Sequence, residues 1–256
     1  MAVYVLSDLH LSTNTKTNKS MEVFGSRWRG YMERIETNWR RLVEPCDTVI
    51  IPGDISWAMT LEEATEDFAY LESLPGNKII SKGNHDYWWA TQAKVSAFFE
   101  KNGFHTIRML HNNAFAVEDF LIAGSRGWYN DENGNNVPSG TDYRKIVARE
   151  AIRVRLSLTE AQKLDEQEGL NREKLVFLHF PPVFREFRCE EILAVLREFG
   201  VTRCFYGHIH GVYDIPGSFV DNDITFTMVS ADYLNGKALA HHICKLHSLA
   251  VVVAAN

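Results

Sequence analysis

The chain of 256 residues has 45% hydrophobic and 23% charged residues, which is ordinary for a soluble globular protein and excludes a disordered chain, a collagen-like chain and a disulfide miniprotein. The net charge of −6 argues against a protein that holds long nucleic acids on a broad basic face, but it does not exclude a small phosphorylated substrate. The longest apolar run, residues 249–255, is far shorter than the roughly 18 residues of a membrane span, so we expect no membrane contact.

In the first part of the chain, short apolar or β-branched segments alternate with longer segments of helical spacing. The capping-box pattern of Thr60 and Glu63 predicts a helix start, and Gly103 is a typical residue after a helix end. The predicted strands are 3–7, 48–51 and 78–81, and the predicted helices are 28–43, 60–74 and 91–102.

The second part of the chain continues this alternation. The predicted strands are 106–110, 114–117, 120–123, 174–178, 203–206, 225–230 and 248–253, and the predicted helices are 143–168 and 190–199. We expect the longer helix to break near residues 157–159, and the Asn, Asp, Gly and Pro residues of 129–140 predict a long loop. Strands separated by helices predict an α/β layered fold, and the absence of a recognisable linker predicts one domain over 1–256.

The cysteines and the N-terminal residues bear on the cellular compartment. No C-x-x-C pair occurs among Cys46, Cys189, Cys204 and Cys244, which excludes a zinc ribbon and a thioredoxin-type motif. The first residues lack a basic segment and a small-residue cleavage site, so we expect no signal peptide, a cytoplasmic location and reduced thiols.

Polar residues with potential metal-binding side chains follow five of the predicted strands. They are Asp8 and His10, then Asp54, then Asn84 with His85 and Asp86, then His179, and finally His208 and His210. Ligands of α/β sheets bind beyond the carboxyl ends of strands, so these side chains are expected to converge at one edge. Nitrogen and oxygen donors without a thiolate favour Mn, Fe or Zn over an iron–sulfur cluster.

The local spacing of these donors supports their convergence. Asp8 and His10 are two residues apart, as are His208 and His210. On extended backbone, residues i and i+2 point the same way, so each pair is expected to present both donors to one site. Glycines precede Asp54, Asn84 and His208, and a glycine allows a sharp turn and a close approach of the backbone at a strand end.

These five segments resemble the motifs of the calcineurin-like metallophosphoesterase superfamily, which are D-x-H, G-D, G-N-H-D or G-N-H-E, a lone His, and G-H-x-H. Their order and approximate spacing hold from Asp8 to His210, about four fifths of the chain. The resemblance implies a four-layer α-β-β-α sandwich. It also implies a dinuclear metal-dependent phosphoesterase, in which a hydroxide that bridges two divalent or trivalent ions attacks phosphorus directly.

The resemblance further implies a role for each residue. Asp8, His10 and His210 would bind the first ion, Asn84, His179 and His208 would bind the second, and Asp54 would bridge both. His85 would act as general acid toward the leaving oxygen, and Asp86 would orient His85 through a hydrogen bond. Asp86 could instead cap the following helix.

Aromatic and basic residues flank these segments. Trp57, Tyr87 and Arg126 could line a substrate pocket, with Arg126 contacting phosphate, or could serve in ordinary packing, and the sequence leaves both interpretations open. We interpret Trp88 and Trp89 as packing residues, and the charged residues of 143–168 as a solvated helix face.

Several alternatives stay open within and beyond this class. The motifs do not separate a phosphomonoesterase from a phosphodiesterase acting on nucleotides or from a phosphoprotein phosphatase. Lys82 stands where eukaryotic Ser/Thr protein phosphatases carry Arg, and Asp86 replaces their Glu, which weakens the last alternative. A non-catalytic docking scaffold with the same fold is the alternative from another class. The sequence leaves open the physiological substrate, the native metals and the oligomeric state.

Overall fold

The computed structural model describes residues 1–14, 19–128, 142–235 and 244–245, in which two larger β-sheets pack face to face. The first sheet has the strand order β13-β1-β2-β3-β4, in which β1 to β4 are parallel and β13 pairs antiparallel to β1. The strands are β1 (Val3–Val5), β2 (Thr48–Pro52), β3 (Asn77–Ser81), β4 (Ile107–Met109) and β13 (Cys244–Lys245).

The second sheet has the order β11-β12-β10-β7-β6-β5, with four parallel central strands and one antiparallel strand at each edge. Its strands are β5 (Phe115–Val117), β6 (Phe120–Ser125), β7 (Glu173–Leu178), β10 (Arg203–Tyr206), β11 (Ser218–Asp221) and β12 (Ile224–Met228). A separate hairpin joins β8 (Val183–Phe184) to β9 (Phe187–Arg188).

Strand side chains alternate between the inner core, which lies between the sheets, and two outer cores. On β7, Leu175 and Phe177 point into the inner core, whereas Val176 and Leu178 belong to an outer core. Phe177 also stacks on Phe205 of β10, with ring centroids 5.0 Å apart. This period of two explains why the central strands read as continuous apolar runs, because both faces of each sheet are covered.

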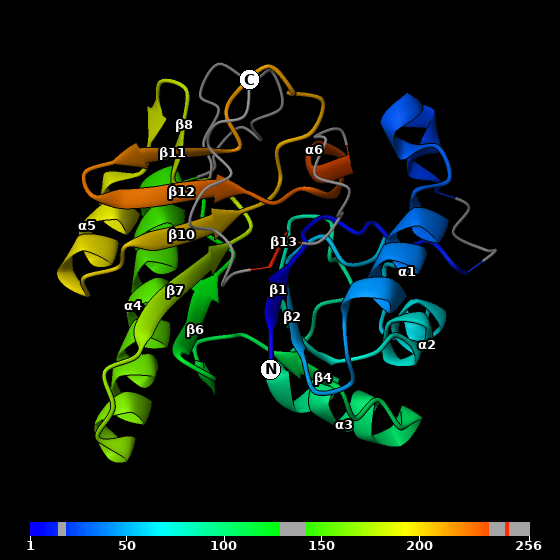
Figure 1. Ribbon diagram of the computed structural model, residues 1–256, viewed down its shortest axis with the longest axis horizontal. Helices are drawn as coiled ribbons and strands as arrows, with labels where there is room; N and C mark the ends of the chain where they lie inside the picture. Colours follow the sequence, from blue (N-terminus) through cyan, green and yellow to red (C-terminus); the bar gives the residue numbers. More distant parts are fainter. Residues whose placement is uncertain (15–18, 129–141, 236–243, 246–256) are drawn as a thin grey trace.

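Helices cover the outer face of each sheet, as Figure 1 shows. The first sheet carries α1 (Tyr31–Leu42), α2 (Thr65–Ser73) and α3 (Gln92–Asn102), and the second carries α4 (Tyr143–Glu168) and α5 (Glu190–Glu198). Short helices are η1 (Met21–Phe24), η2 (Ser26–Trp28) and α6 (Ala231–Asn235). The four layers confirm the predicted α-β-β-α sandwich.

The element predictions differ from the structure in three main respects. Helix α2 begins at Thr65 rather than Thr60, although Thr60 Oγ1 does accept the Glu63 amide at 3.2 Å. Helix α4 does not break near Ser157, because this buried hydroxyl accepts the Gly124 amide and donates to the Asn113 carbonyl instead of competing with the helix. Strands β8, β9, β11 and β13 were not predicted, and the predicted loop 129–140 and strand 248–253 lie outside the described residues.

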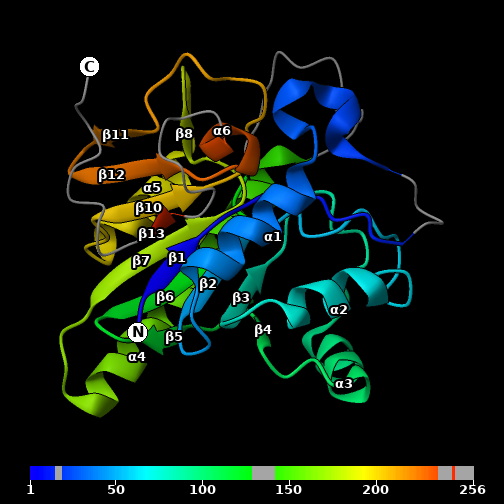
Figure 2. The ribbon, with the colours of Figure 1, turned by 45° about the vertical axis from the view of Figure 1, so that its right-hand side comes forward.

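The two sheets meet at the edge where their parallel strands end. Beyond β1, Ser7 forms a parallel bridge with Ser230, which follows β12. The Ser7 amide donates to the Val229 carbonyl at 2.9 Å, and the Ala231 amide donates to the Ser7 carbonyl at 3.1 Å. Because this bridge is parallel, the carboxyl ends of both sets of strands lie at the same edge of the molecule (Figure 2).

The sequence also predicts reduced thiols and no contact with a membrane. Cys46, Cys189 and Cys204 are free. Among the described residues, no helix is both long enough and apolar enough to span a bilayer.

Candidate metal centre and active site

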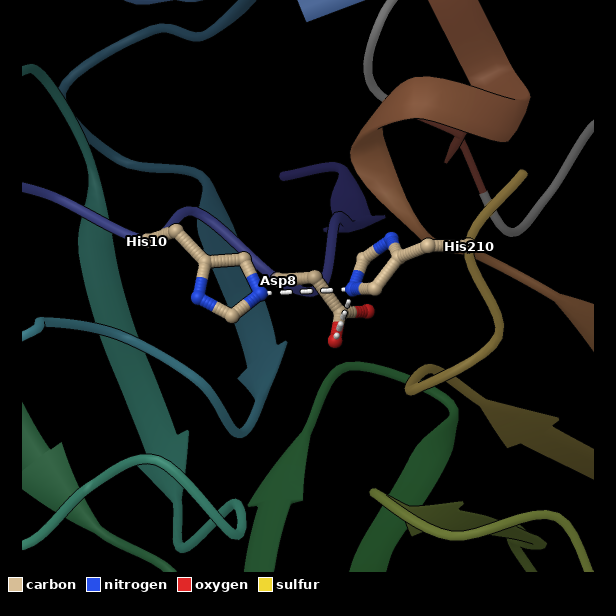
Figure 3. A group of neighbouring side chains, drawn as sticks. All are labelled: Asp8, His10 and His210. Carbon is tan, nitrogen blue, oxygen red and sulfur yellow. Dashed lines mark hydrogen bonds and ion pairs between the residues drawn. The ribbon is translucent and has the colours of Figure 1, made fainter. Parts of the chain in front are cut away.

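Donor side chains from both sheets converge where the strands end. His10 and His210 face each other with their Nε2 atoms 3.2 Å apart, and Asp8 Oδ1 lies 3.5 Å from His210 Nε2 (Figure 3). The donor atoms of these three residues all lie within 4.8 Å of one another. Asp8 follows β1 and His210 follows β10, so one compact donor group draws on both sheets.

Asp54 lies between this donor group and a second one. Its Oδ2 atom is 3.6 Å from His10 Nε2 and 3.5 Å from His179 Nε2. The second group consists of Asp8, Asp54 and His179, whose donor atoms again lie within 4.8 Å of one another. Asp54 Oδ2 is buried without a hydrogen-bond partner among the described residues, and such an atom is costly unless a ligand satisfies it.

The other two predicted ligands lie beside His179. Asn84 Oδ1 is 2.6 Å from His179 Nε2, and the rings of His179 and His208 are 5.2 Å apart. The backbone amide of His208 donates to both carboxylate oxygens of Asp8, at 3.0 and 3.1 Å. The structure therefore brings all seven predicted ligands to one edge, while their division between two ions stays a prediction.

The backbone at four of these positions is left-handed. The φ angles are 62° at Asp8, 45° at His10, 51° at Asp54 and 69° at His208. The prediction that D-x-H and H-x-H present their donors from extended backbone is therefore wrong, since tight turns aim the side chains instead. Each such residue costs on the order of 1–3 kcal/mol, and strain of this kind concentrates at functional sites.

Two glycines allow the strand ends to approach each other closely. A Cβ atom on Gly83 would collide with the Asp54 carboxylate, and one on Gly207 would collide with the Asp8 carboxylate. This confirms the interpretation of these glycines as positions of close approach.

The buried setting keeps two of the histidines neutral. Burial lowers the pKa of His179 to about 3 and that of His208 to about 4. Burial also acts to lower the pKa of His210, but hydrogen bonds to Asp232 and Asp8 raise it to about 10. Neutral imidazole is the form that binds metal, so His179 and His208 are already in the required state at neutral pH.

Comparison with known proteins relates this chain to one protein family. A model of the calcineurin-like phosphoesterases matches residues 1–212, well over half of the chain. The chain belongs to this family. Membership supports metal-dependent hydrolysis of phosphoesters in general. No curated protein matches the chain.

Solved structures share the fold at low sequence identity. The phosphopantetheinyl hydrolase PptH from Mycobacterium tuberculosis matches with a TM-score of 0.54 and 14% identity, over 100% of this chain and 98% of that one. The protein TT1561 of Thermus thermophilus matches with a TM-score of 0.51 and 11% identity, over 90% of this chain and 89% of that one. At such identities the likeness shows the fold alone.

Asp86 of this calcineurin-like phosphoesterase has a role that the sequence did not predict. Within the described part of the chain, no hydrogen bond joins Asp86 to His85, so Asp86 does not make the orienting contact that was predicted for it. The fully buried Asp86 carboxylate accepts hydrogen bonds from other donors instead. These hydrogen bonds hold the turn after β2 against the turn after β3. These donors are the backbone amides of Asp54, Ile55, Ser56 and Gly83 and the indole of Trp88, at 2.7–3.3 Å.

His85 lies at the half-exposed rim of the phosphoesterase site, between aromatic rings. Its backbone amide donates to Asp54 Oδ1 at 2.8 Å. The Trp57 ring stacks on His10 at 4.8 Å and lies 4.5 Å from the His85 ring. Tyr87 is 57% exposed, 6.3 Å from the His85 ring, whereas Trp88 is buried. Trp57 and Tyr87 therefore flank the candidate acid, and Trp88 serves packing as predicted.

Asp232 is a residue at this site that sequence reasoning missed. Its buried carboxylate accepts hydrogen bonds from His210 Nδ1 at 2.9 Å, the Gly211 amide at 3.0 Å and the Tyr213 hydroxyl at 2.9 Å. With Nδ1 engaged, His210 keeps Nε2 for an ion. Asp232 lies beyond the last motif and outside residues 1–212, so no spacing in the sequence could have identified it.

The residues present fit a pair of metal ions. The donor set is entirely nitrogen and oxygen, Asp54 Oδ2 lacks a partner among the described residues, and Asp232 supplies the outer carboxylate that metal-binding histidines commonly have.

Proposed function

We propose that this calcineurin-like phosphoesterase is a dinuclear metal-dependent hydrolase of phosphorylated small molecules, with Mn, Fe or Zn as the metal. The observation that carries the proposal is the buried Asp54 Oδ2 atom, which has no hydrogen-bond partner in the described part of the chain and lies 3.6 Å from His10 Nε2 and 3.5 Å from His179 Nε2. An oxygen in that position suits a carboxylate shared by two ions. The net charge of −6 favours a small phosphorylated substrate over a long nucleic acid.

The seven predicted ligands would divide into two sets of three, each holding one ion, and a shared carboxylate. Asp8, His10 and His210 would hold the first, and Asn84, His179 and His208 the second, with Asp54 between them. When bound, such a pair of ions supplies activated water at neutral pH and neutralises charge on the phosphoryl oxygens. Asp8, His10, Asp54 and His179 are buried away from bulk water, and the backbone turns that carry them would fix their direction before substrate arrives.

His85 would donate the proton to the leaving oxygen. It lies at the half-exposed rim, where a substrate can reach it, and its backbone is tied to Asp54 by a 2.8 Å hydrogen bond. Contact with the tilted Trp57 ring, 4.5 Å away, restricts the His85 ring and keeps the acid near the place where the leaving group would stand. Tyr87 and Arg126 would contact the rest of the substrate.

Turnover of p-nitrophenyl phosphate and bis-p-nitrophenyl phosphate with added Mn²⁺ tests the proposal. We expect chelation or Asp54→Asn to abolish hydrolysis, and His85→Ala to slow it by roughly two to four orders of magnitude. His105→Ala, at an exposed histidine, is the matched control. If the wild-type protein hydrolyses neither ester with any divalent metal, the result would contradict the proposed enzymatic function and favour a docking scaffold.

A wider substrate panel addresses the finer questions. Phosphomonoesters, nucleotide phosphodiesters, phosphopeptides and a phosphopantetheinyl ester distinguish the alternatives within the class, the last because one structural neighbour is a phosphopantetheinyl hydrolase. A cytoplasmic location remains a prediction from the sequence.

A further inference from the structure

Basic side chains gather around one buried carboxylate next to the candidate active site. Arg126 Nη2 and Arg153 Nε lie 3.6 and 3.8 Å from the same oxygen, Oε1 of Glu150. Glu150 is 3% exposed, and its other oxygen is 3.2 Å from Ser125 Oγ. Arg126 follows β6, and Arg153 lies in the first half of α4. We call Lys82, Arg126 and Arg153 the cationic cluster.

The cationic cluster holds more positive charge than Glu150 can neutralise. Lys82 is partly buried and lies close enough to Arg126, Arg153, Glu150 and Asp86 to interact with the charge of each. Within the described residues, Lys82 has no ion pair, and Arg126 Nε is buried without a hydrogen-bond partner. The three cations therefore face two carboxylates, Glu150 and Asp86, and Asp86 already accepts hydrogen bonds from four backbone amides and the Trp88 indole. Partly buried positive charge of this kind is unfavourable unless an anion accompanies it.

The cationic cluster adjoins the second donor group of the site. The Arg126 carbonyl accepts the backbone amides of His179 at 3.1 Å and of Phe180 at 2.8 Å. The Arg126 guanidinium carbon lies 5.9 Å from the centre of the Phe180 ring, which is also 5.0 Å from the His179 ring and 4.5 Å from the His208 ring. Lys82 precedes Gly83 and Asn84 directly. One aromatic ring thus separates the cluster from a predicted metal ligand.

We propose that the cationic cluster binds a second anionic group of the substrate, so that the preferred substrates are phosphoesters with a carboxylate or phosphate a few bonds from the scissile phosphoryl group. This inference rests on the proposed phosphoesterase function. Guanidinium groups pair with two oxygens at once and suit carboxylate and phosphate geometry. A purely structural role, in which Arg126 and Arg153 only attach α4 to the sheet through Glu150, leaves the excess charge and Lys82 unexplained.

The test compares esters that differ by one charge. The substrates are phenyl phosphate and a series of phenyl phosphates with a carboxylate attached through one to four methylenes, assayed as phosphate release by the Mn²⁺-loaded enzyme. We expect the best charged member to exceed phenyl phosphate at least tenfold in kcat/KM, mainly through KM, with the advantage falling as salt rises. Arg153→Gln should remove most of this advantage and leave phenyl phosphate within about twofold.

Arg155→Gln is the matched control, because Arg155 lies on the same helix and pairs with Glu198. It should leave the preference intact. The proposal would be overturned if the wild type had the same kcat/KM for all the esters. It would also be overturned if Arg153→Gln lowered kcat/KM by the same factor for all of them. Arg126→Gln provides a second variant, and it should also lose the preference.

A binding experiment separates this inference from the proposed function. Thermal stabilisation of the Mn²⁺-loaded protein by butylphosphonate is compared with stabilisation by butane-1,4-diphosphonate. We expect at least tenfold tighter binding of the diphosphonate in the wild type, lost in Arg153→Gln. If the diphosphonate binds in this way but no ester is cleaved, the proposed function fails and the anion site stands. If the two ligands bind alike while esters are cleaved, the anion site fails and the function stands.

Discussion

At the scale of single residues, the position of His210 depends on a carboxylate outside the recognised motifs. Asp232 receives the His210 Nδ1–H at 2.9 Å, and it is itself held by the Gly211 amide and the Tyr213 hydroxyl. When His210 binds an ion as a neutral imidazole it has one N–H, which this contact holds on Nδ1, so Nε2 is left for the ion. Asp232 therefore positions a predicted ligand, His210, without belonging to the predicted ligand set itself.

Replacement of Asp232 should weaken metal binding. In Asp232→Asn the amide cannot accept all three hydrogen bonds, so we expect Mn²⁺ affinity to fall by roughly 10–100-fold, as for other outer-sphere partners of metal ligands. Equilibrium dialysis with metal analysis measures this without any assay of activity. Tyr213→Phe removes one donor to Asp232 but keeps the contact with His210, and it should change affinity little. Unchanged affinity in Asp232→Asn would contradict the role.

A second residue-scale prediction concerns Lys78, far from the motifs. This side chain is fully buried, and its ammonium donates to the Leu74 carbonyl and to Thr106 Oγ1. Burial lowers its pKa from 10.5 to about 8. Between these values the unfolded chain binds more protons than the folded one, so stability should rise with pH across this window.

Comparison with Lys78→Met isolates that contribution. The free energy of unfolding of the wild type relative to the variant should be lowest below pH 8 and should increase toward pH 10.5, where the penalty for burying the charge disappears. Urea unfolding at several pH values measures it, and Lys94→Met, at an exposed position, controls for the loss of a lysine. A difference that is flat across the window between the two pKa values would contradict the expectation.

At the scale of elements, the turns after β2 and β3 form one unit around Asp86. Its carboxylate accepts the Asp54 amide at 2.9 Å and the Gly83 amide at 2.7 Å, which joins the two turns that carry Asp54 and Asn84. The G-N-H-D motif thus contains a candidate ligand, a candidate acid and the residue that fixes the neighbouring turn. Asp86 serves the site by holding backbone, not by contacting His85.

The two roles of Asp86 predict different phenotypes. In Asp86→Asn the side-chain NH₂ replaces one carboxylate oxygen, so some of the buried N–H donors lose their acceptor. We expect the free energy of unfolding to fall by on the order of 3 kcal/mol. Urea unfolding in EDTA measures this loss. His85→Ala should cost little stability in the same measurement, because His85 is half-exposed. A slow but fully stable Asp86→Asn enzyme would instead support an orienting contact with His85.

At the scale of the whole molecule, the site lies on the line where the two sheets meet. The predicted ligands after β1, β2 and β3 belong to one sheet, and those after β7 and β10 belong to the other. His10 and His210, 200 residues apart in sequence, have Nε2 atoms 3.2 Å apart. An ion bound there would tie both sheets together, so metal binding should stabilise the entire fold.

We therefore expect Mn²⁺ to raise the free energy of unfolding relative to EDTA-treated protein. A concentration a hundredfold above the dissociation constant adds about 2.7 kcal/mol for one site. Asp54→Asn should lose most of this increment, whereas its stability in EDTA should stay near or above that of the wild type, since burial and the neighbouring Asp86 and Asp8 carboxylates raise the pKa of Asp54 and disfavour its charged form. Equal stability with and without metal would contradict a site that joins the sheets.

The sequence by itself determined the donors and the edge at which they meet. Parallel strands place their carboxyl ends together, so recognition of the strands brings Asp8, Asp54 and Asn84 close together at the edge of one sheet and His179 and His208 at the edge of the other. Glycines at positions 83 and 207 mark the close approaches that this edge requires. Helix α3 was also predictable, because Thr91 and Gly103 are local signals at its two ends.

Only the tertiary structure decided how those donors are aimed and supported. The left-handed turns at Asp8 and His208, the contact of Asp232 with His210, and the pairing of Arg126 and Arg153 with Glu150 have no local sequence signal. Each depends on packing between segments that are distant in the chain or on a backbone geometry that surrounding contacts enforce. Periodicity and spacing report which face a residue occupies, but a hydrogen bond across the molecule exists only once the layers have packed.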